Sequence, residues 1–193
     1  MSANRPVDAR RGDRGFSVIE LIAVMAVAAI VGAIAIPQMQ QMVASMRLGA
    51  ATREVERELQ TARLKAVSTN RRLRVRMNCP AAGYYRTVEF LGTAADNAAN
   101  RCLPTAGNYP YPPADTDPLT VPNLDGPVRS FYQGVTVPTT TFEFRPDGTA
   151  WTVDVAGVAQ PIPVGGVQLI VTRLSKTKAI EVNALGKIRI PIQ

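Results

Sequence analysis

The chain has 193 residues, of which 46% are apolar and 19% charged, and its formal net charge is +7. This length accommodates one domain of ordinary size together with a terminal extension. The sequence has no histidine, and without this common general base and metal ligand, hydrolytic triads and most transition-metal sites are disfavoured. The basic balance suits an anionic partner, either nucleic acid or phospholipid headgroups, although a solvated basic surface would have the same composition.

The chain begins with a basic segment followed by a long apolar block. Residues 1–15 contain four arginines, and residues 16–36 contain only two polar side chains, Ser17 and Glu20, before Pro37. As a helix, the block would be about 32 Å long, close to the hydrocarbon thickness of a bilayer. The preceding arginines predict that the N-terminus stays in the cytoplasm and that the rest of the chain is exported.

The residues of this block allow three interpretations. A cleaved secretory signal peptide would explain the small residues Ala33 and Ala35, which match a cleavage pattern and would leave a chain beginning at Ile36. An ordinary signal anchor would tolerate Glu20 near the membrane interface. In the third interpretation Glu20 has a function, which would justify a charge that costs at least about 2.5–3.5 kcal/mol at a bilayer centre.

The stretch "RGFSVIEL" (residues 14–21) resembles the processing site of type IV pilins and type II secretion pseudopilins. In that pattern a basic leader ends in glycine, here Gly15, and the mature chain begins with phenylalanine, here Phe16. The glutamate at the fifth mature position is Glu20. Pro37 falls at mature position 22, where pilins commonly carry a helix-kinking proline. The resemblance therefore favours the third interpretation.

The resemblance implies that a prepilin peptidase cleaves between Gly15 and Phe16 and methylates the new amine. Glu20 would then lie one helical turn from a new positive charge, in the first turn, where the helix dipole favours a carboxylate. A carboxylate in a bilayer needs a partner, and we expect the Phe16 amine of a neighbouring subunit to supply it. Cleavage would separate a cytoplasmic leader, residues 1–15, from a transmembrane assembly helix, residues 16–37.

Residues 38–70 continue the helix with one apolar face. Apolar residues recur there at spacings of seven, four, three and four, which is typical of an amphipathic helix, and they are Leu48, Val55, Leu59, Ala62 and Ala66. Asn70 is a plausible end of this helix. Its apolar face needs a partner, which the rest of the chain must provide.

Residues 71–193 are expected to form a β-rich head. The stretch "RLRVRMN" alternates strictly, and "YYRTVEFLG", "TTTFEFRPDGTAWTVDV", "VQLIVTRL", "AIEVNAL" and "KIRIPI" also have strand character. Residues 92–130 include seven prolines between Pro104 and Pro127, so an irregular loop is expected there. The predicted fold is α+β and pilin-like, with a long kinked N-terminal helix packed against a C-terminal antiparallel β-sheet head.

Two cysteines, Cys79 and Cys102, are too few for a zinc site in a chain without histidine. If the head is exported, a disulfide between them is expected, worth roughly 3 kcal/mol in the chain-entropy model. Two reduced thiols in the core are the alternative. A disulfide would attach the irregular loop to the end of the first strand.

Three further stretches resemble the FimT/GspH group of minor pilins and minor pseudopilins. They are "AATREVERELQTARLKAVSTNRRLRVRM", "FRPDGTA" and the ending "IEVNALGKIRI". Some FimT-like minor pilins are associated with DNA uptake, and the basic ending of the group, here Gly186 to Arg189, has been tied to DNA binding. Lys187 stands where arginine is more usual, and lysine lacks the bidentate geometry of arginine toward phosphate.

Five cations are candidate contacts for DNA phosphates, namely Arg72, Arg74 and Arg76 along one strand face and Lys187 and Arg189 near the end. Such contacts would give salt-dependent binding without base readout. Alternatively, these cations pair with carboxylates of a neighbouring subunit or keep the sheet soluble.

The predicted function is that of a non-catalytic minor pilin of a type IV pilus that contributes to DNA uptake. The alternative is a minor pseudopilin of a type II secretion system. The expected partners are other pilin or pseudopilin subunits, prepilin peptidase, the inner-membrane assembly platform and DNA. We expect a single-pass inner-membrane protein with a periplasmic head, which then enters a filament, and we expect no cofactor or metal. A membrane-anchored enzyme is disfavoured because no nucleophile lies in a recognisable motif.

Overall fold

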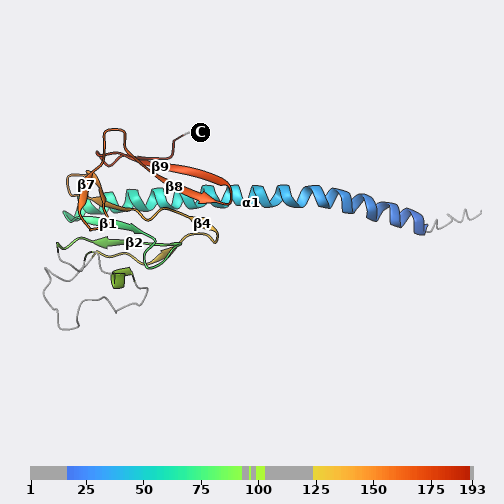
Figure 1. The fold of residues 1–193 in the computed structure, drawn as a ribbon, viewed down its shortest axis with the longest axis horizontal. Helices are drawn as coiled ribbons and strands as arrows, with labels where there is room; N and C mark the ends of the chain where they lie inside the picture. Colours follow the sequence, from blue (N-terminus) through green and yellow to red (C-terminus); the bar gives the residue numbers. More distant parts are fainter. Residues whose placement is uncertain (1–16, 93–95, 97–98, 103–123, 192–193) are drawn as a thin grey trace, which may run out of the picture. The chain divides into compact units, whose positions relative to one another are not determined.

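The computed structural model describes residues 17–92, 96, 99–102 and 124–191 (Figure 1). The chain falls into two compact units, Met1–Met42 and Val43–Gln193, which are described separately below. Several predictions concern residues outside the described ranges. These are the leader, both residues of the processing site, Gly15 and Phe16, and most of the irregular loop.

One long helix, α1 (Val18–Thr69), belongs to both units. It begins after Ser17, whose carbonyl accepts hydrogen bonds from the backbone N–H groups of Glu20 (3.0 Å) and Leu21 (3.2 Å). The helix continues through Pro37 without interruption. A proline in a helix removes one backbone hydrogen bond, and here this loss does not end the helix.

The end of α1 is fixed by a local capping motif. Asn70 takes a left-handed conformation with φ of 54°. The N–H of Arg71 donates to the carbonyl of Ala66 at 3.1 Å, and the N–H of Asn70 donates to that of Val67 at 3.4 Å. This pair of bonds is the Schellman motif, in which asparagine is a common substitute for glycine. The predicted helix end at Asn70 is confirmed.

In the N-terminal unit, α1 exposes apolar side chains on all sides. Its most apolar window of 18 residues has a mean hydropathy of 2.7, and none of that window is buried. By length and composition this helix could cross a membrane. Exposed apolar surface of this extent marks a segment that contacts lipid or other protein.

The second unit contains two antiparallel sheets. The first has the order β3-β2-β1-β5-β6-β7, with the strands β1 (Leu73–Met77), β2 (Tyr84–Glu89), β3 (Arg129–Ser130), β5 (Thr141–Phe144), β6 (Ala150–Val153) and β7 (Ala159–Pro161). The second has the order β10-β9-β8-β4, with the strands β4 (Val135–Thr136), β8 (Val167–Arg173), β9 (Lys176–Val182) and β10 (Ile188–Arg189). A short 3₁₀ helix, η2 (Ala99–Cys102), lies between β2 and β3 in the chain.

The longer strands match the predicted segments, and the expected combination of a long helix with an antiparallel head is confirmed. The head differs from the prediction in having two sheets rather than one. After β7 the chain turns at Pro163–Gly166, where Gly166 has a φ of 79°. It then enters β8, which pairs with β9 and with the short strand β4.

Both sheets share one hydrophobic core with the apolar stripe of α1. The predicted stripe residues are all buried, namely Leu48, Val55, Leu59, Ala62 and Ala66. Val75 and Phe142 from the first sheet and Leu169 and Ile180 from the second complete this core. The helix thus supplies the surface on which the head is built, because neither sheet alone could bury its apolar face.

Candidate functional site

Glu20 is in the first turn of α1 and its side chain is exposed. It lies at one end of an apolar face of the helix that is formed by Ala23, Val24, Val27, Ala28, Val31 and Gly32. Among the described residues, no cation forms an ion pair with it. A carboxylate next to an apolar face of membrane length requires a positive partner from another source. The Phe16 amine that the sequence suggests for this role lies outside the described residues.

The predicted row of exposed arginines on β1 is not a continuous surface. Arg74 is only 1% exposed, and it forms an ion pair with Glu143 of the neighbouring strand β5 at 2.9 Å. It also donates to the carbonyl of Gly157 at 3.2 Å and lies over the ring of Phe90, 4.1 Å from its centroid. Arg74 is therefore part of the fold, and the expectation that it contacts phosphate is wrong.

Arg76 is half-buried on the same face of the first sheet. Burial lowers the pKa of its guanidinium group, and the nearby charges of Arg101 and Arg74 lower it further. Arg72 precedes β1 and is exposed. Of the three arginines in the predicted row, Arg72 alone is exposed, and its guanidinium lies over the ring of Phe90, 5.7 Å from the centroid.

The η2 segment packs on the part of this face that carries Arg76 and Arg86. Arg86, opposite Arg76 in the register, donates through Nη1 to the carbonyl of Arg101 at 2.5 Å. Its Nε donates to the carbonyl of Gly126 at 2.7 Å. Strict alternation along β1 correctly placed its arginines on one face, but it could not show that another segment covers that face.

Arg101 anchors this covering segment from a fully buried position. It forms ion pairs of 2.9 Å with both Asp96 and Asp125, and it donates to the carbonyl of Glu89 at 2.7 Å. The adjacent residue, Cys102, forms a disulfide with Cys79. The described part of the irregular loop is thus held by one covalent bond and one buried charge cluster. Sequence reasoning missed Arg101, because nothing in the local pattern distinguishes it from a solvated loop arginine.

The basic C-terminal ending packs closely against Arg63 of α1 at Gly186. Gly186 has a φ of 72°, and a Cβ there would overlap the carbonyl oxygen of Gly148 and the side chain of Arg63. Arg63 occupies this space because it donates to the carbonyl of Gly148 at 3.0 Å and to that of Leu185 at 3.2 Å. This glycine therefore has a packing role.

The two cations of this ending differ in their surroundings. Lys187 is exposed and forms no ion pair with any described residue. Arg189 is exposed as well, but it donates to the carboxylate of Glu181 through Nη2 at 3.0 Å to each oxygen and through Nε at 3.2 Å. Lys187 lines a shallow groove of about 330 Å³, together with Gln60, Arg63, Leu64, Leu185, Gly186 and Ile188. This ending thus offers one unpaired positive charge rather than two.

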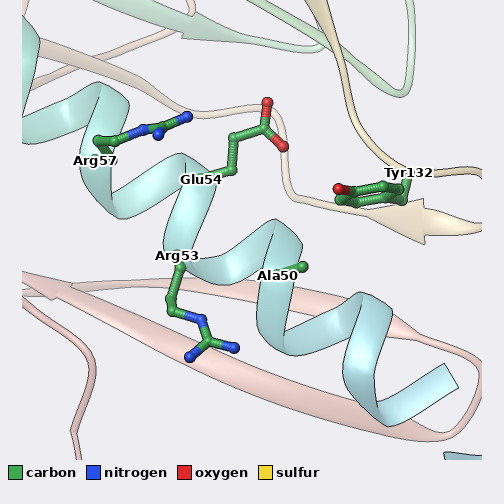
Figure 2. A pocket seen from close by; sticks show the side chains of 5 residues that line it. All are labelled: Ala50, Arg53, Glu54, Arg57 and Tyr132. Carbon is green, nitrogen blue, oxygen red and sulfur yellow. The ribbon is translucent and has the colours of Figure 1, made fainter. Parts of the chain in front are cut away.

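A second groove, of about 380 Å³, lies along α1 and is lined by Ala50, Arg53, Glu54, Arg57 and Tyr132 (Figure 2). Figure 2 shows the phenol of Tyr132 directed toward Glu54, while Arg53 and Arg57 extend to different sides of the helix. Glu54 accepts a hydrogen bond of 2.9 Å from the hydroxyl of Tyr85. Burial raises the pKa of Tyr85, and the bond to Glu54 raises it further. The groove is open and polar.

Residues 10–36 match the family model described as the prokaryotic N-terminal methylation motif. In the structure this motif is followed by one long helix and an antiparallel head, which is the pilin-like fold that the sequence predicts. Two crystal structures of the type IV minor pilin FimU from Pseudomonas aeruginosa (strain PAO1) are similar to the chain. They are 14% and 13% identical to it, with TM-scores of 0.45 and 0.44. The matches cover 75% of this chain and 88% and 92% of the FimU chains. Among curated proteins, none matches the sequence.

Proposed function

We propose that the chain is a non-catalytic minor pilin subunit of a type IV pilus, of the FimT/GspH group. Prepilin peptidase would remove residues 1–15 and methylate the amine of Phe16. Before assembly the subunit would span the inner membrane once, with its N-terminus in the cytoplasm and its head in the periplasm. It would then enter a filament with other pilins through the inner-membrane assembly platform, using α1 as the packing element.

The observation that carries this proposal is Glu20 at the start of an apolar helix, inside the methylation motif. Its carboxylate has no ion-pair partner among the described residues of its own chain, and lipid cannot solvate it. A new amine on a neighbouring subunit would neutralise it, and the first turn of the helix favours its negative charge. Pairing between chains would fix the register of each subunit against the next, without any catalytic step.

Intact-mass analysis tests the processing step. The full chain is expressed in a host that has prepilin peptidase and in a matched strain that lacks it. We expect a chain that starts at Phe16 and carries one additional methyl group in the first strain, and an uncleaved chain in the second. A chain that starts at Ile36 in both strains would instead identify a secretory signal peptide and contradict the proposal.

A type II secretion pseudopilus would use the same N-terminal chemistry, so the processing test does not separate the two systems. The basic composition of the head favours the pilus, because a surface filament that handles DNA benefits from positive charge. Complementation separates them: the gene should restore pili to a strain that lacks its minor pilins. Restoration of protein secretion alone would favour the pseudopilus.

A contribution to DNA uptake would rest on the exposed cations Arg72, Lys187 and Arg189. Because Arg189 is already paired with Glu181, Lys187 should dominate any contact at the C-terminal ending. Gel-shift titration of the full chain in detergent at two salt concentrations measures this. We expect Lys187→Ala to weaken binding and to reduce its salt dependence by about one phosphate contact. Unchanged binding would remove the ending from this role.

A further inference from the structure

Five cations lie at or near the end of the head that is nearest Val43, and the two segments that carry them contain no carboxylate, although Glu54 directly follows Arg53. Residues 43–53 of α1 contain Arg47 and Arg53, and residues 173–178 of the β8–β9 hairpin contain Arg173, Lys176 and Lys178. We name these five side chains the basic collar. No described carboxylate forms an ion pair with any of them, whereas Arg101 is paired with two carboxylates within the head. An unpaired group of like charges favours an anionic partner.

The two parts of the collar meet at Gly49. A Cβ at this buried glycine would lie 3.5 Å from Nζ of Lys178 and 3.7 Å from Nη2 of Arg53, so both cationic groups lie over the same point of the helix. Figure 1 shows β8 and β9 running along the part of α1 that belongs to the head. The hairpin therefore brings its cations to those of the helix.

Leu174, at the tip of this hairpin, combines an exposed apolar side chain with a left-handed backbone conformation. Its side chain is 76% exposed, and its φ is 53°. A turn that joins paired strands through two residues usually places glycine or asparagine in such a conformation. A bulky apolar residue there costs backbone energy and exposes apolar area to water. The cost of exposing apolar area is recovered if the tip enters an apolar or interfacial environment.

No charged residue separates the membrane-length apolar segment from the collar in the sequence. Arg47 is the first charged residue after Glu20, because residues 21–46 are all uncharged. At the helical rise, these 26 residues measure about 39 Å, close to the 40–45 Å of a bilayer with its headgroups. Arg47 is therefore the first cation after the apolar segment that headgroup phosphates could contact.

We propose that the basic collar and Leu174 form a docking surface for the anionic phospholipid headgroups of the membrane that α1 spans. The collar cations would contact headgroup phosphates, and Leu174 would enter the interface between them. This inference rests on the membrane anchor of the proposed function and adds a second contact with the bilayer. The docked head would be held against the membrane until the subunit is extracted into a filament, when the contact is released.

Fluorescence quenching tests the contact in the full chain. The sequence has one tryptophan, Trp151, so Leu174→Trp in a Trp151→Phe background reports on the tip alone. The chain is reconstituted into phosphatidylcholine vesicles, with or without phosphatidylglycerol, that contain lipid brominated near the headgroup. We expect strong quenching with phosphatidylglycerol, little without it, and loss of quenching at about 1 M salt, where the Debye length is about 3 Å.

Charge reversal supplies the matched control. Lys176→Glu combined with Lys178→Glu should abolish the quenching, whereas Lys187→Glu, which changes an exposed lysine outside the collar, should leave it intact. Equal quenching in both kinds of vesicle, or quenching that survives the double reversal, would overturn the proposal. So would a tip that remains accessible to aqueous acrylamide in phosphatidylglycerol vesicles.

Three further outcomes distinguish failure of the docking surface from failure of the membrane anchor and from binding of a different partner. If the chain floats with vesicles but the tip stays in water, the docking surface fails and the anchor stands. If the chain does not float with either kind of vesicle, the anchor fails and the docking surface fails with it. A tip that responds to duplex DNA in detergent and not to phosphatidylglycerol would overturn lipid docking in favour of a nucleic-acid surface.

Discussion

The charged side chains of the N-terminal unit and of the head have opposite surroundings. In described residues 18–42 the only charged side chain is Glu20, which is exposed and has no partner there. In the head, Arg74 and Arg101 are buried, and both form ion pairs with carboxylates from segments distant in the sequence. An unpaired charge within an apolar segment of membrane length favours a partner in another molecule, whereas a buried, paired charge contributes to the fold.

The largest expected effect tests the unpaired charge. Glu20→Ala should leave cleavage and methylation intact but abolish incorporation into filaments, because the neighbouring amine then has no counter-charge in lipid. Sheared filaments and whole membranes are compared by immunoblotting. Gln38→Ala, in the same helix but uncharged in both forms, should still be incorporated. Normal incorporation of Glu20→Ala would show that filament assembly does not require this carboxylate.

The next effect tests the buried charges. Arg101→Met leaves Asp96 and Asp125 without their cation, and removing one partner of a buried pair typically costs about 3–5 kcal/mol. Urea unfolding of the full chain in detergent, followed by the fluorescence of Trp151, should show this loss. Arg189→Met, which removes an exposed pair with Glu181, should cost at most about 1 kcal/mol. Equal losses would mean that burial does not separate the two kinds of ion pair.

The contrast between local and distant contacts also explains which features could be predicted from the sequence. The processing motif and the stripe from Leu48 to Ala66 depend on neighbours in the sequence, so the helix, its end at Asn70 and the main strands were predictable. The division into two sheets and the burial of Arg74 depend on segments that pack across the chain. For Arg74 the decisive partner, Glu143, is 69 residues away, and alternation along a strand carries no information about it.

A smaller effect tests whether the C-terminal ending is shaped by packing. Gly186→Ala places a Cβ against the carbonyl of Gly148 and the side chain of Arg63, in a left-handed conformation. Such strain costs of order 1–3 kcal/mol, and the overlap should bring the total to the upper part of this range. Gly165→Ala is the control, since a Cβ there meets nothing within 4 Å and no positive φ has to be kept. Matching midpoints for the two variants in urea would contradict the packing role.

The smallest effect concerns the bond between the sheet and the helix at Tyr85. Because the pKa of Tyr85 is raised in the folded chain, its contribution to stability is complete below about pH 10, the ordinary value for tyrosine. As the pH rises further, the unfolded chain loses this proton more readily than the folded chain does, so the free energy of unfolding falls. Tyr85→Phe should remove this alkaline loss.

At neutral pH the same variant should cost about 1 kcal/mol, the net value of one hydrogen bond. The aromatic ring that Tyr85→Phe retains would keep the stacking on Phe131, whose centroid lies 4.7 Å from that of Tyr85, so the change isolates the hydroxyl. Tyr132→Phe removes an exposed hydroxyl and should leave both the neutral stability and its alkaline decline unchanged. Should Tyr85→Phe retain the full decline, the hydroxyl of Tyr85 would not be the group whose titration causes it. The stability of the head would then depend less on the hydrogen bond between Tyr85 and Glu54 than on the buried ion pairs.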